Sequence, residues 1–275
     1  MPDSVAGEPC LRLKAADGAS AVVSRWGAQL LSWRPAGDDE RLFLSPKATL
    51  DGSAPIRGGV TLVFPQFANY GALPAHGFAR DRWWAQRLGW SADAVTFELR
   101  DDPHTRALWP HRFACEYTVR IGGPTLAMEL SITNHGETAF RFQAALHTYL
   151  RVDDLSLLRI EGLAGAPYLD RTAADHLDRQ YEAQLAIAGE VDRIYPGAPK
   201  RVLVREPLRS IEIVADGGFT DQVLWNPGPE RCARIADLER RAWRQLLCAE
   251  ASCIADPPLL PPRAVWRGSQ RLTAM

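Results

Sequence analysis

Apolar and polar residues alternate along several stretches of the chain, as in β-strands that bury one face. The clearest alternation runs through residues 113–121 and resumes through 126–132, after Gly122-Gly123-Pro124. A glycine-rich turn between two alternating segments predicts a β-hairpin. A further long strand is expected from about residue 140 to 152, after the turn at Asn134-His135-Gly136.

Shorter strand patterns recur along the rest of the chain, with turn residues between them. They cover residues 11–14, 21–24, 29–33, 95–100, 211–214, 244–251 and 265–272. Only the segment 170–184 is a candidate for a short helix. Many short strands with frequent turns predict an all-β fold, a sandwich of large antiparallel sheets.

No shift in composition divides the chain, so we expect one β-sandwich domain over residues 1–275, with residues 1–8 as a flexible N-terminus. The proline-rich segment 256–263 is expected to be a stiff connector to the last strand. With 275 residues and 46% hydrophobic residues, the chain can bury a large core without disulfides or metals.

Charge and cysteine content exclude several classes of protein. The 32 basic residues balance 33 acidic ones, which argues against a general nucleic-acid binder. The five cysteines form no CxxC pair and indicate reduced thiols in a cytoplasmic protein. No signal peptide and no apolar run of ~18–20 residues is visible, so no membrane association is expected.

Two glycine-containing segments carry residues suited to binding an anion. Arg57 precedes Gly58-Gly59, and His76 and Arg80 lie four residues apart beside Gly77. A guanidinium matches the oxygens of a phosphate, and glycine permits close approach of a ligand. By itself, each segment is more often a structural loop.

The segment 141–150 has an unusually polar face for a strand whose other face is apolar. Residues 141, 143, 145, 147 and 149 share one side, which places Gln143, His147 and Tyr149 together. Either this side lines a polar cleft or it is an exposed outer face, and the segment alone favours neither.

Glu250 lies within a nearly continuous apolar run, residues 246–254, typical of a buried strand. A buried carboxylate needs a partner, and burial raises its pKa, which suits a general base. The alternative is a glutamate facing solvent at a strand end. Asp192 gives a weaker signal of the same kind, and Asp221 could simply cap a turn.

The four other histidines lack metal-ligand spacing and are expected in surface loops or turns: His104, His111, His135 and His176. The sequence therefore predicts no metal site.

Taken together, these segments resemble the aldose 1-epimerase superfamily, in particular its hexose-6-phosphate mutarotase branch. The resemblance follows the family's order over nearly the whole chain after Gly27. It rests on residues 27–33, 56–59 with 64–65, 76–80, 146–149, 191–195, 223–227, 248–250 and 266–270.

The resemblance implies a galactose-mutarotase-like β-sandwich that interconverts the anomers of a sugar 6-phosphate without a cofactor. His147 then matches the catalytic acid and Glu250 the catalytic base. The substrate-binding matches are Arg57 and Arg80 for the phosphate, and His76 and Asp192 for the sugar. Two positions depart from the pattern of many relatives: Ala75 stands where some have a glutamine, and Ala251 where many have a proline.

Alternatives are an aldose 1-epimerase acting on free sugars and a non-catalytic sugar-phosphate-binding protein on the same fold. A glycosidase would need a second carboxylate opposite Glu250, and the sequence offers no clear one. With Glu250 ionised and His147 cationic, the rate should follow a bell-shaped pH profile. Asp192 is the residue expected to raise the pKa of His147. We expect a monomer or weak homodimer.

Overall fold

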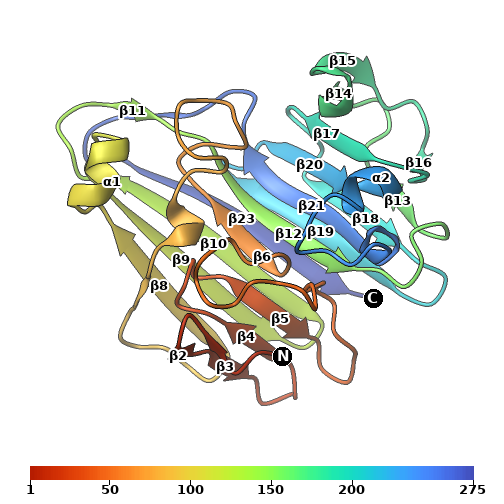
Figure 1. The fold of residues 1–275 in the computed structure, drawn as a ribbon, viewed down its shortest axis with the longest axis horizontal. Helices are drawn as coiled ribbons and strands as arrows, with labels where there is room; N and C mark the ends of the chain where they lie inside the picture. Colours follow the sequence, from red (N-terminus) through yellow and green to blue (C-terminus); the bar gives the residue numbers. More distant parts are fainter.

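The alternating segments form the strands of two large antiparallel sheets, as the sequence predicts (Figure 1). The computed structural model describes residues 1–275. The ten-stranded sheet contains, in spatial order, β15 (His176–Arg179), β14 (Pro167–Asp170), β17 (Val191–Tyr195), β20 (Asp221–Asn226), β21 (Leu246–Cys253), β12 (Ala144–Arg151), β6 (Val60–Val63), β5 (Leu30–Arg34), β4 (Ser20–Val23) and β3 (Leu11–Lys14).

The nine-stranded sheet contains, in spatial order, β16 (Gln184–Leu185), β13 (Arg159–Glu161), β18 (Arg201–Arg205), β19 (Ser210–Gly217), β23 (Val265–Ala274), β10 (Thr125–Asn134), β9 (Phe113–Gly122), β8 (Ala94–Arg100) and β7 (Ala85–Gln86). Two small pairs join β1 (Ser4–Val5) to β2 (Glu8–Pro9) and β11 (Phe140–Arg141) to β22 (Leu259–Leu260).

Helices are few and short, as expected for this fold class. They are α1 (Pro103–Leu108), α2 (Gly228–Cys232) and the 3-10 turns η1 (Ala79–Asp81), η2 (Arg171–Ala173) and η3 (Ala242–Arg244). No helix of the structure is long and apolar enough to cross a membrane.

The main core is a cluster of 57 buried residues that takes apolar side chains from both sheets. In the β9–β10 hairpin, Leu126 pairs with Ile121 and Leu130 with Tyr117, so their apolar side chains share one face. From the ten-stranded sheet, Leu146 of β12 enters the same cluster. The period-two alternation in the sequence arises because every second side chain of these strands enters this core.

The other face of the ten-stranded sheet is also covered in its centre. Tyr149 and Cys248 belong to a second buried cluster, and Val63 and Ala145 to a third. All eight residues of β21 are therefore buried, which explains why its sequence is almost continuously apolar. The functional side chains described below lie on this second face.

Three sequence expectations differ from the structure. The segment 170–184 forms β14–β16 with the single turn η2 rather than a short helix, in line with its poor helical spacing of apolar residues. Residues 4–9 form the β1–β2 hairpin, anchored by Val5, which is 1% exposed and packs near Ile56. The strand expected from 140 to 152 is interrupted after Arg141.

Candidate active site

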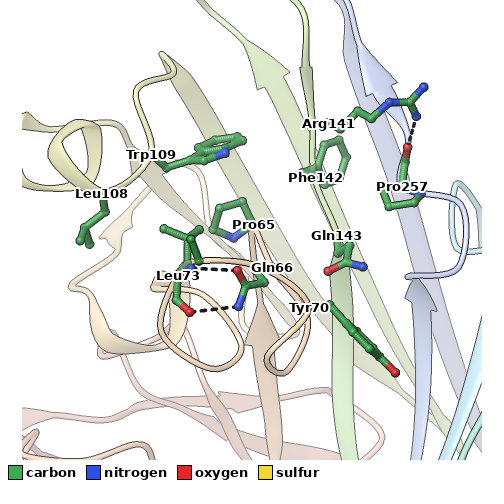
Figure 2. A pocket seen from close by; sticks show the side chains of 11 residues that line it. Pro65, Gln66, Tyr70, Leu73, Leu108, Trp109, Arg141, Phe142, Gln143 and Pro257 are labelled. Atoms are coloured by element: carbon green, nitrogen blue, oxygen red, sulfur yellow. Dashed lines mark hydrogen bonds between the residues drawn. The ribbon is translucent and has the colours of Figure 1, made fainter. Parts of the chain in front are cut away.

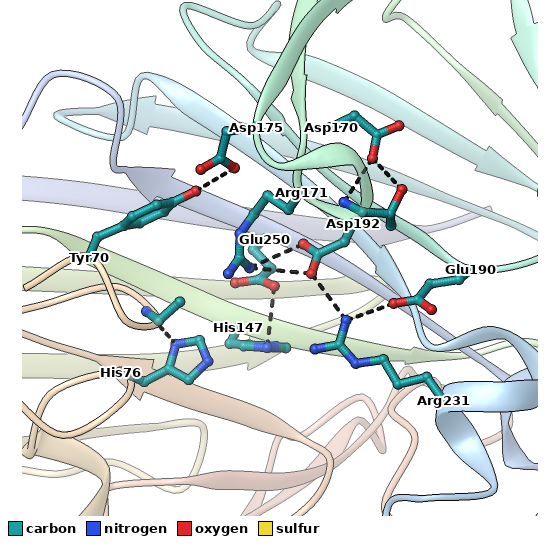
Figure 3. A network of polar contacts seen from close by, with 12 residues as sticks. Tyr70, His76, His147, Asp170, Arg171, Asp175, Glu190, Asp192, Arg231 and Glu250 are labelled. Atoms are coloured by element: carbon teal, nitrogen blue, oxygen red, sulfur yellow. Dashed lines mark hydrogen bonds and ion pairs between the residues drawn. The ribbon is translucent and has the colours of Figure 1, made fainter.

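His147 and Glu250 lie on the neighbouring strands β12 and β21 and make direct contact (Figure 3). Nε2 of His147 is 3.3 Å from Oε1 of Glu250. Both side chains are buried, with Glu250 only 1% exposed, so it is not a solvent-facing residue at a strand end. The structure thus brings together the two residues for which the sequence predicted acid and base roles.

Burial acts on the two members of this pair in opposite directions. It raises the pKa of Glu250, and the nearby negative charge of Asp192 raises it further. It lowers the pKa of His147, as do the neighbouring His76, Arg57 and Arg80. Both shifts favour uncharged side chains, so one proton shared by the pair is favoured on the carboxyl group.

Each member of the pair also has a polar atom that no protein group satisfies. Nδ1 of His147 and Oε2 of Glu250 are buried and have no hydrogen-bond partner. Buried polar atoms in a folded protein usually have partners. Their unused hydrogen-bonding capacity therefore sets this pair apart from polar groups that serve only the packing of the core.

Tyr149 and Arg57 hold one side of the His147 ring. The Tyr149 ring stacks on His147 with centroids 4.7 Å apart and an angle of 9° between the planes. Nη1 of Arg57 donates to the Tyr149 hydroxyl at 3.1 Å, and its Nε lies 3.2 Å from both carboxylate oxygens of Asp237. Arg57 is therefore held in one orientation with part of its guanidinium facing the cleft.

The loop that carries Arg57 needs the glycine that the sequence placed there. Gly59 has φ +66, and a Cβ at this residue would lie 2.0 Å from the carbonyl oxygen of Leu30. Only glycine fits so close to the neighbouring strand. The glycines thus fix the path of the loop as it enters β6.

His76 faces His147 across the cleft, with ring centroids 5.6 Å apart. Its Nδ1 accepts a hydrogen bond from the Ala68 N–H at 3.3 Å. Burial and the nearby Arg80 lower the pKa of His76 to about 3. The ring is therefore neutral at pH 7, and its Nε2–H can donate to a ligand.

Asp192 on β17 is held between two arginines rather than against His147. Nη1 of Arg171 lies 3.2 and 3.3 Å from its oxygens, and Nη1 of Arg231 lies 3.5 Å away. Burial nevertheless raises the pKa of Asp192. The expectation that Asp192 raises the pKa of His147 is wrong, because this pKa is lowered, first by burial and then by His76, Arg57 and Arg80.

These side chains line a cleft of about 220 Å³. Its lining residues are Arg57, Phe67, His76, His147, Tyr149, Arg171, Asp192, Val223, Trp225, Arg231, Ile235 and Glu250. Five of the six predicted site residues are among them. The exception is Arg80, whose Nη2 donates to the Ala75 carbonyl at 2.7 Å.

Sequence reasoning missed Arg171, Arg231 and Asp237. Arg171 comes from the turn η2 and Arg231 from α2, and Asp237 lies in the loop after α2. None stands in a motif, and 29 of the 32 basic residues are arginines, so no arginine is conspicuous. Only the three-dimensional arrangement identifies them.

Gln143 does not line the cleft with His147 as one interpretation of its strand suggested. It joins neighbouring loops instead, accepting from the Phe67 N–H at 2.9 Å and donating to the Ile254 carbonyl at 3.1 Å. It borders a separate pocket of about 340 Å³ (Figure 2). Asp221 is structural, since it accepts from the backbone N–H groups of Ile254 and Ala255.

A β-sandwich that holds a buried imidazole–carboxylate pair in a cleft lined by three arginines has a site suited to proton transfer on a polar ligand. The family model described as aldose 1-epimerase matches residues 9–273. The chain therefore belongs to the aldose 1-epimerase family, whose members have the galactose-mutarotase-like fold found here.

Proteins similar to this chain agree with this assignment. A protein of Cenchrus ciliaris named "Putative glucose-6-phosphate 1-epimerase" is 31% identical over 96% of this chain and 84% of its own length. One of Escherichia coli K12 with the same name is 33% identical over 82% and 77%. The crystal structure of a "putative mutarotase" from Salmonella typhimurium superposes with a TM-score of 0.85 at 27% identity, covering 93% of this chain and 87% of that one.

Proposed function

We propose that this mutarotase acts on a hexose 6-phosphate, with glucose 6-phosphate as its substrate. Its site is then formed by His147, Glu250, Arg57, His76 and Asp192, with Arg80 acting from behind the lining. The observation that carries the proposal is the 3.3 Å contact between His147 and Glu250 in an arginine-lined cleft. The names of the Cenchrus ciliaris and Escherichia coli relatives support the same substrate.

The pair can supply both proton transfers that anomer exchange requires. Glu250 as carboxylate removes the proton from the anomeric hydroxyl, while His147 gives a proton to the ring oxygen, and the ring opens to the aldehyde. Rotation about the bond between the first two carbons presents the other carbonyl face. The reverse transfers close the ring as the other anomer, and each positioned group contributes ~10²–10⁴-fold.

The working form of the pair carries the same number of protons as the resting form. Burial favours a protonated Glu250 beside a neutral His147. Moving that proton across the 3.3 Å contact gives carboxylate and imidazolium without uptake from solution. The pair is therefore competent as long as it holds one proton in total.

Three arginines give the cleft its preference for an anionic substrate. Arg57 faces the cleft while Asp237 fixes its direction. Arg171 pairs with Asp192, and Arg231 pairs with Glu190 and more distantly with Asp192. Arg80 adds positive potential from behind the lining, since its charge lowers the pKa of both His76 and His147. A guanidinium binds phosphate oxygens through two N–H groups at once.

The test is anomer-exchange NMR with the purified protein on glucose 6-phosphate, glucose and galactose. The proposal expects exchange to be accelerated far more for the phosphate ester. Equal acceleration of the free sugars would show an aldose 1-epimerase without phosphate preference. Binding of glucose 6-phosphate without accelerated exchange would show a non-catalytic binding protein.

We also propose that the protein is a cytoplasmic enzyme with one catalytic domain, as a monomer or weak homodimer. The five cysteines are all free thiols, and four of them are buried. The 57-residue core takes side chains from both sheets, which supports one domain over residues 1–275. Size-exclusion chromatography with light scattering tests the oligomeric state.

A further inference from the structure

Gln270, in the sequence motif 266–270, reaches toward the active-site strands from the opposite sheet. It lies on β23, is 0% exposed and points into the core between the sheets. Its Nε2 donates to the carbonyl of Ala249 at 3.0 Å, and its Oε1 accepts from the Thr148 hydroxyl at 2.6 Å. Ala249 and Thr148 are the chain neighbours of Glu250 and His147.

The direction of these two hydrogen bonds follows from the groups involved. A backbone carbonyl can only accept, so the amide nitrogen of Gln270 must face Ala249. Its amide oxygen then faces Thr148, whose hydroxyl can donate. Both amide atoms are therefore used, and neither bond can reverse without breaking the other.

The two hydrogen bonds of Gln270 lie where the pairing between the strands of His147 and Glu250 is interrupted. The register pairs Leu146 with Ala251 and then Tyr149 with Cys248. The pairs between them, His147 with Glu250 and Thr148 with Ala249, are absent from the β12–β21 ladder. Over the same residues, both strands keep their ladders with their other neighbours, β6 and β20.

We propose that Gln270 sets the separation of His147 and Glu250 by joining Thr148 and Ala249 across this interruption. The ladder that would otherwise fix the spacing of the two strands is missing there, so a side chain from the second sheet takes its place. Gln270 is thus a positioning residue, and the proposal rests on the proposed function of the pair.

The main test replaces Gln270 with methionine, which has similar length but neither hydrogen bond. We expect kcat to fall at least ~10-fold while KM changes less than ~2-fold, because misplacement by 1 Å can cost 10²-fold in rate. The control is Leu272→Ala, a buried change two residues further along the same face of β23. A Gln270→Met variant that stays folded with kcat within ~3-fold of wild type overturns the proposal. The proposal is also overturned if Leu272→Ala, at the same loss of Tm as Gln270→Met, loses as much kcat.

A second pair of variants keeps the proposal testable if Gln270→Met does not fold. Thr148→Val removes the hydroxyl at constant shape, whereas Thr148→Ser retains it. We expect a loss of kcat of at least ~10-fold for the valine variant and near-normal kcat for the serine variant. Similar kcat values for the two would overturn the proposal.

A readout without substrate separates this inference from the proposed function. The titration of His147, followed by NMR of labelled histidine and assigned with His147→Gln, should be displaced in Thr148→Val and unchanged in Thr148→Ser. The variants leave intact the groups that face His147: His76, Tyr149, Glu250, Arg57 and Arg80. Displaced titration without activity on any sugar would defeat the proposed function alone. Unchanged titration in Thr148→Val would defeat the positioning role.

Discussion

Replacing His147 or Glu250 with glutamine measures how much the exchange rate falls when one proton-transfer group is removed. We expect His147→Gln and Glu250→Gln each to lower the exchange rate by at least ~10²-fold, because each removes one proton-transfer group. NMR exchange spectroscopy on glucose 6-phosphate gives the rate, and circular dichroism shows that the variants are folded. His111→Gln and Glu98→Gln, outside the cleft, are matched controls and should retain the wild-type rate. A folded Glu250→Gln variant with a near-normal rate would remove the base role.

The dependence of the rate on pH should reflect the pair rather than its separate members. Burial lowers the pKa of His147, so uptake of a second proton moves below 6.5. Burial raises the pKa of Glu250, so loss of the single proton moves above 4.5. The rate should therefore be bell-shaped, with its acid limb at lower pH than an ordinary histidine would give and its alkaline limb at higher pH than an ordinary glutamate would give.

Rates measured from pH 5 to 9 and corrected for the uncatalysed reaction give this profile. Asp192→Asn should leave the acid limb in place, because Asp192 is paired with Arg171 and Arg231 and does not support the charge of His147. The alkaline limb should move to lower pH in this variant, because the charge of Asp192 helps to raise the pKa of Glu250. An acid limb that also moves to lower pH in Asp192→Asn would restore the role that the sequence suggested for Asp192.

Single residues could be predicted from the sequence where their surroundings were anomalous. Glu250 stood out because a carboxylate is costly in an apolar strand, and His147 because it lay on a polar face. The ionisation of His147 could not be predicted, since it depends on His76, Arg57 and Arg80, which lie far from it in the sequence. Gln143 lay on the same strand as His147, but the interruption of the strand after Arg141 gives it loop contacts.

Among the connecting elements, the loop of Arg57 should control affinity for the phosphate. We expect Arg57→Lys to raise the KM for glucose 6-phosphate by ~10-fold or more, because lysine cannot form a bidentate contact with phosphate. Exchange of free glucose should hardly change. The same loss on both sugars would instead indicate that Arg57 acts structurally through Tyr149.

Arg80 should matter less than Arg57, because its guanidinium is bound to the Ala75 carbonyl and does not line the cleft. We expect Arg80→Ala to raise the KM for glucose 6-phosphate by a smaller factor than Arg57→Ala, measured in the same assay. A larger effect of Arg80→Ala would place its guanidinium on the substrate.

Strands were predictable as elements because alternation is a local property of the sequence. The hairpin at 113–132 and the buried strand of Glu250 needed no knowledge of distant residues. The turn η2 and helix α2 were not predictable as site elements, because Arg171 is placed by its contact with Asp192 of β17, and Arg231 by its contacts with Glu190 and Asp192. No helix forms within 170–184 for a related reason: the pairing of β15 with β14 and of β16 with β13 outweighed a weak local pattern.

The buried carboxyl of Glu250 should make the stability of the whole molecule depend on pH. Because the pKa of Glu250 is raised in the folded chain above 4.5, the folded state binds more protons than the unfolded state at higher pH. The contribution of this carboxyl to stability is therefore lost as pH rises from 4.5. We expect the Tm of Glu250→Gln to exceed that of wild type increasingly from pH 5 to pH 8.

Calorimetry at several pH values measures this difference, and the exposed Glu129→Gln is the control, with a constant difference from wild type. A difference of ~1 kcal/mol corresponds to roughly 2–4 °C for a chain of this size. A Tm difference between Glu250→Gln and wild type that does not vary with pH would show that the buried carboxyl has no such effect.

The two kinds of groups in the cleft come from different parts of the architecture. His147, Glu250 and Asp192 stand on β12, β21 and β17, whereas Arg57, Arg171 and Arg231 come from the segments between strands. Mutant libraries restricted to those segments would therefore vary the choice of sugar while the strands that carry His147 and Glu250 stay unchanged. The same scaffold is thus a starting point for engineering mutarotases toward sugars with other charged substituents.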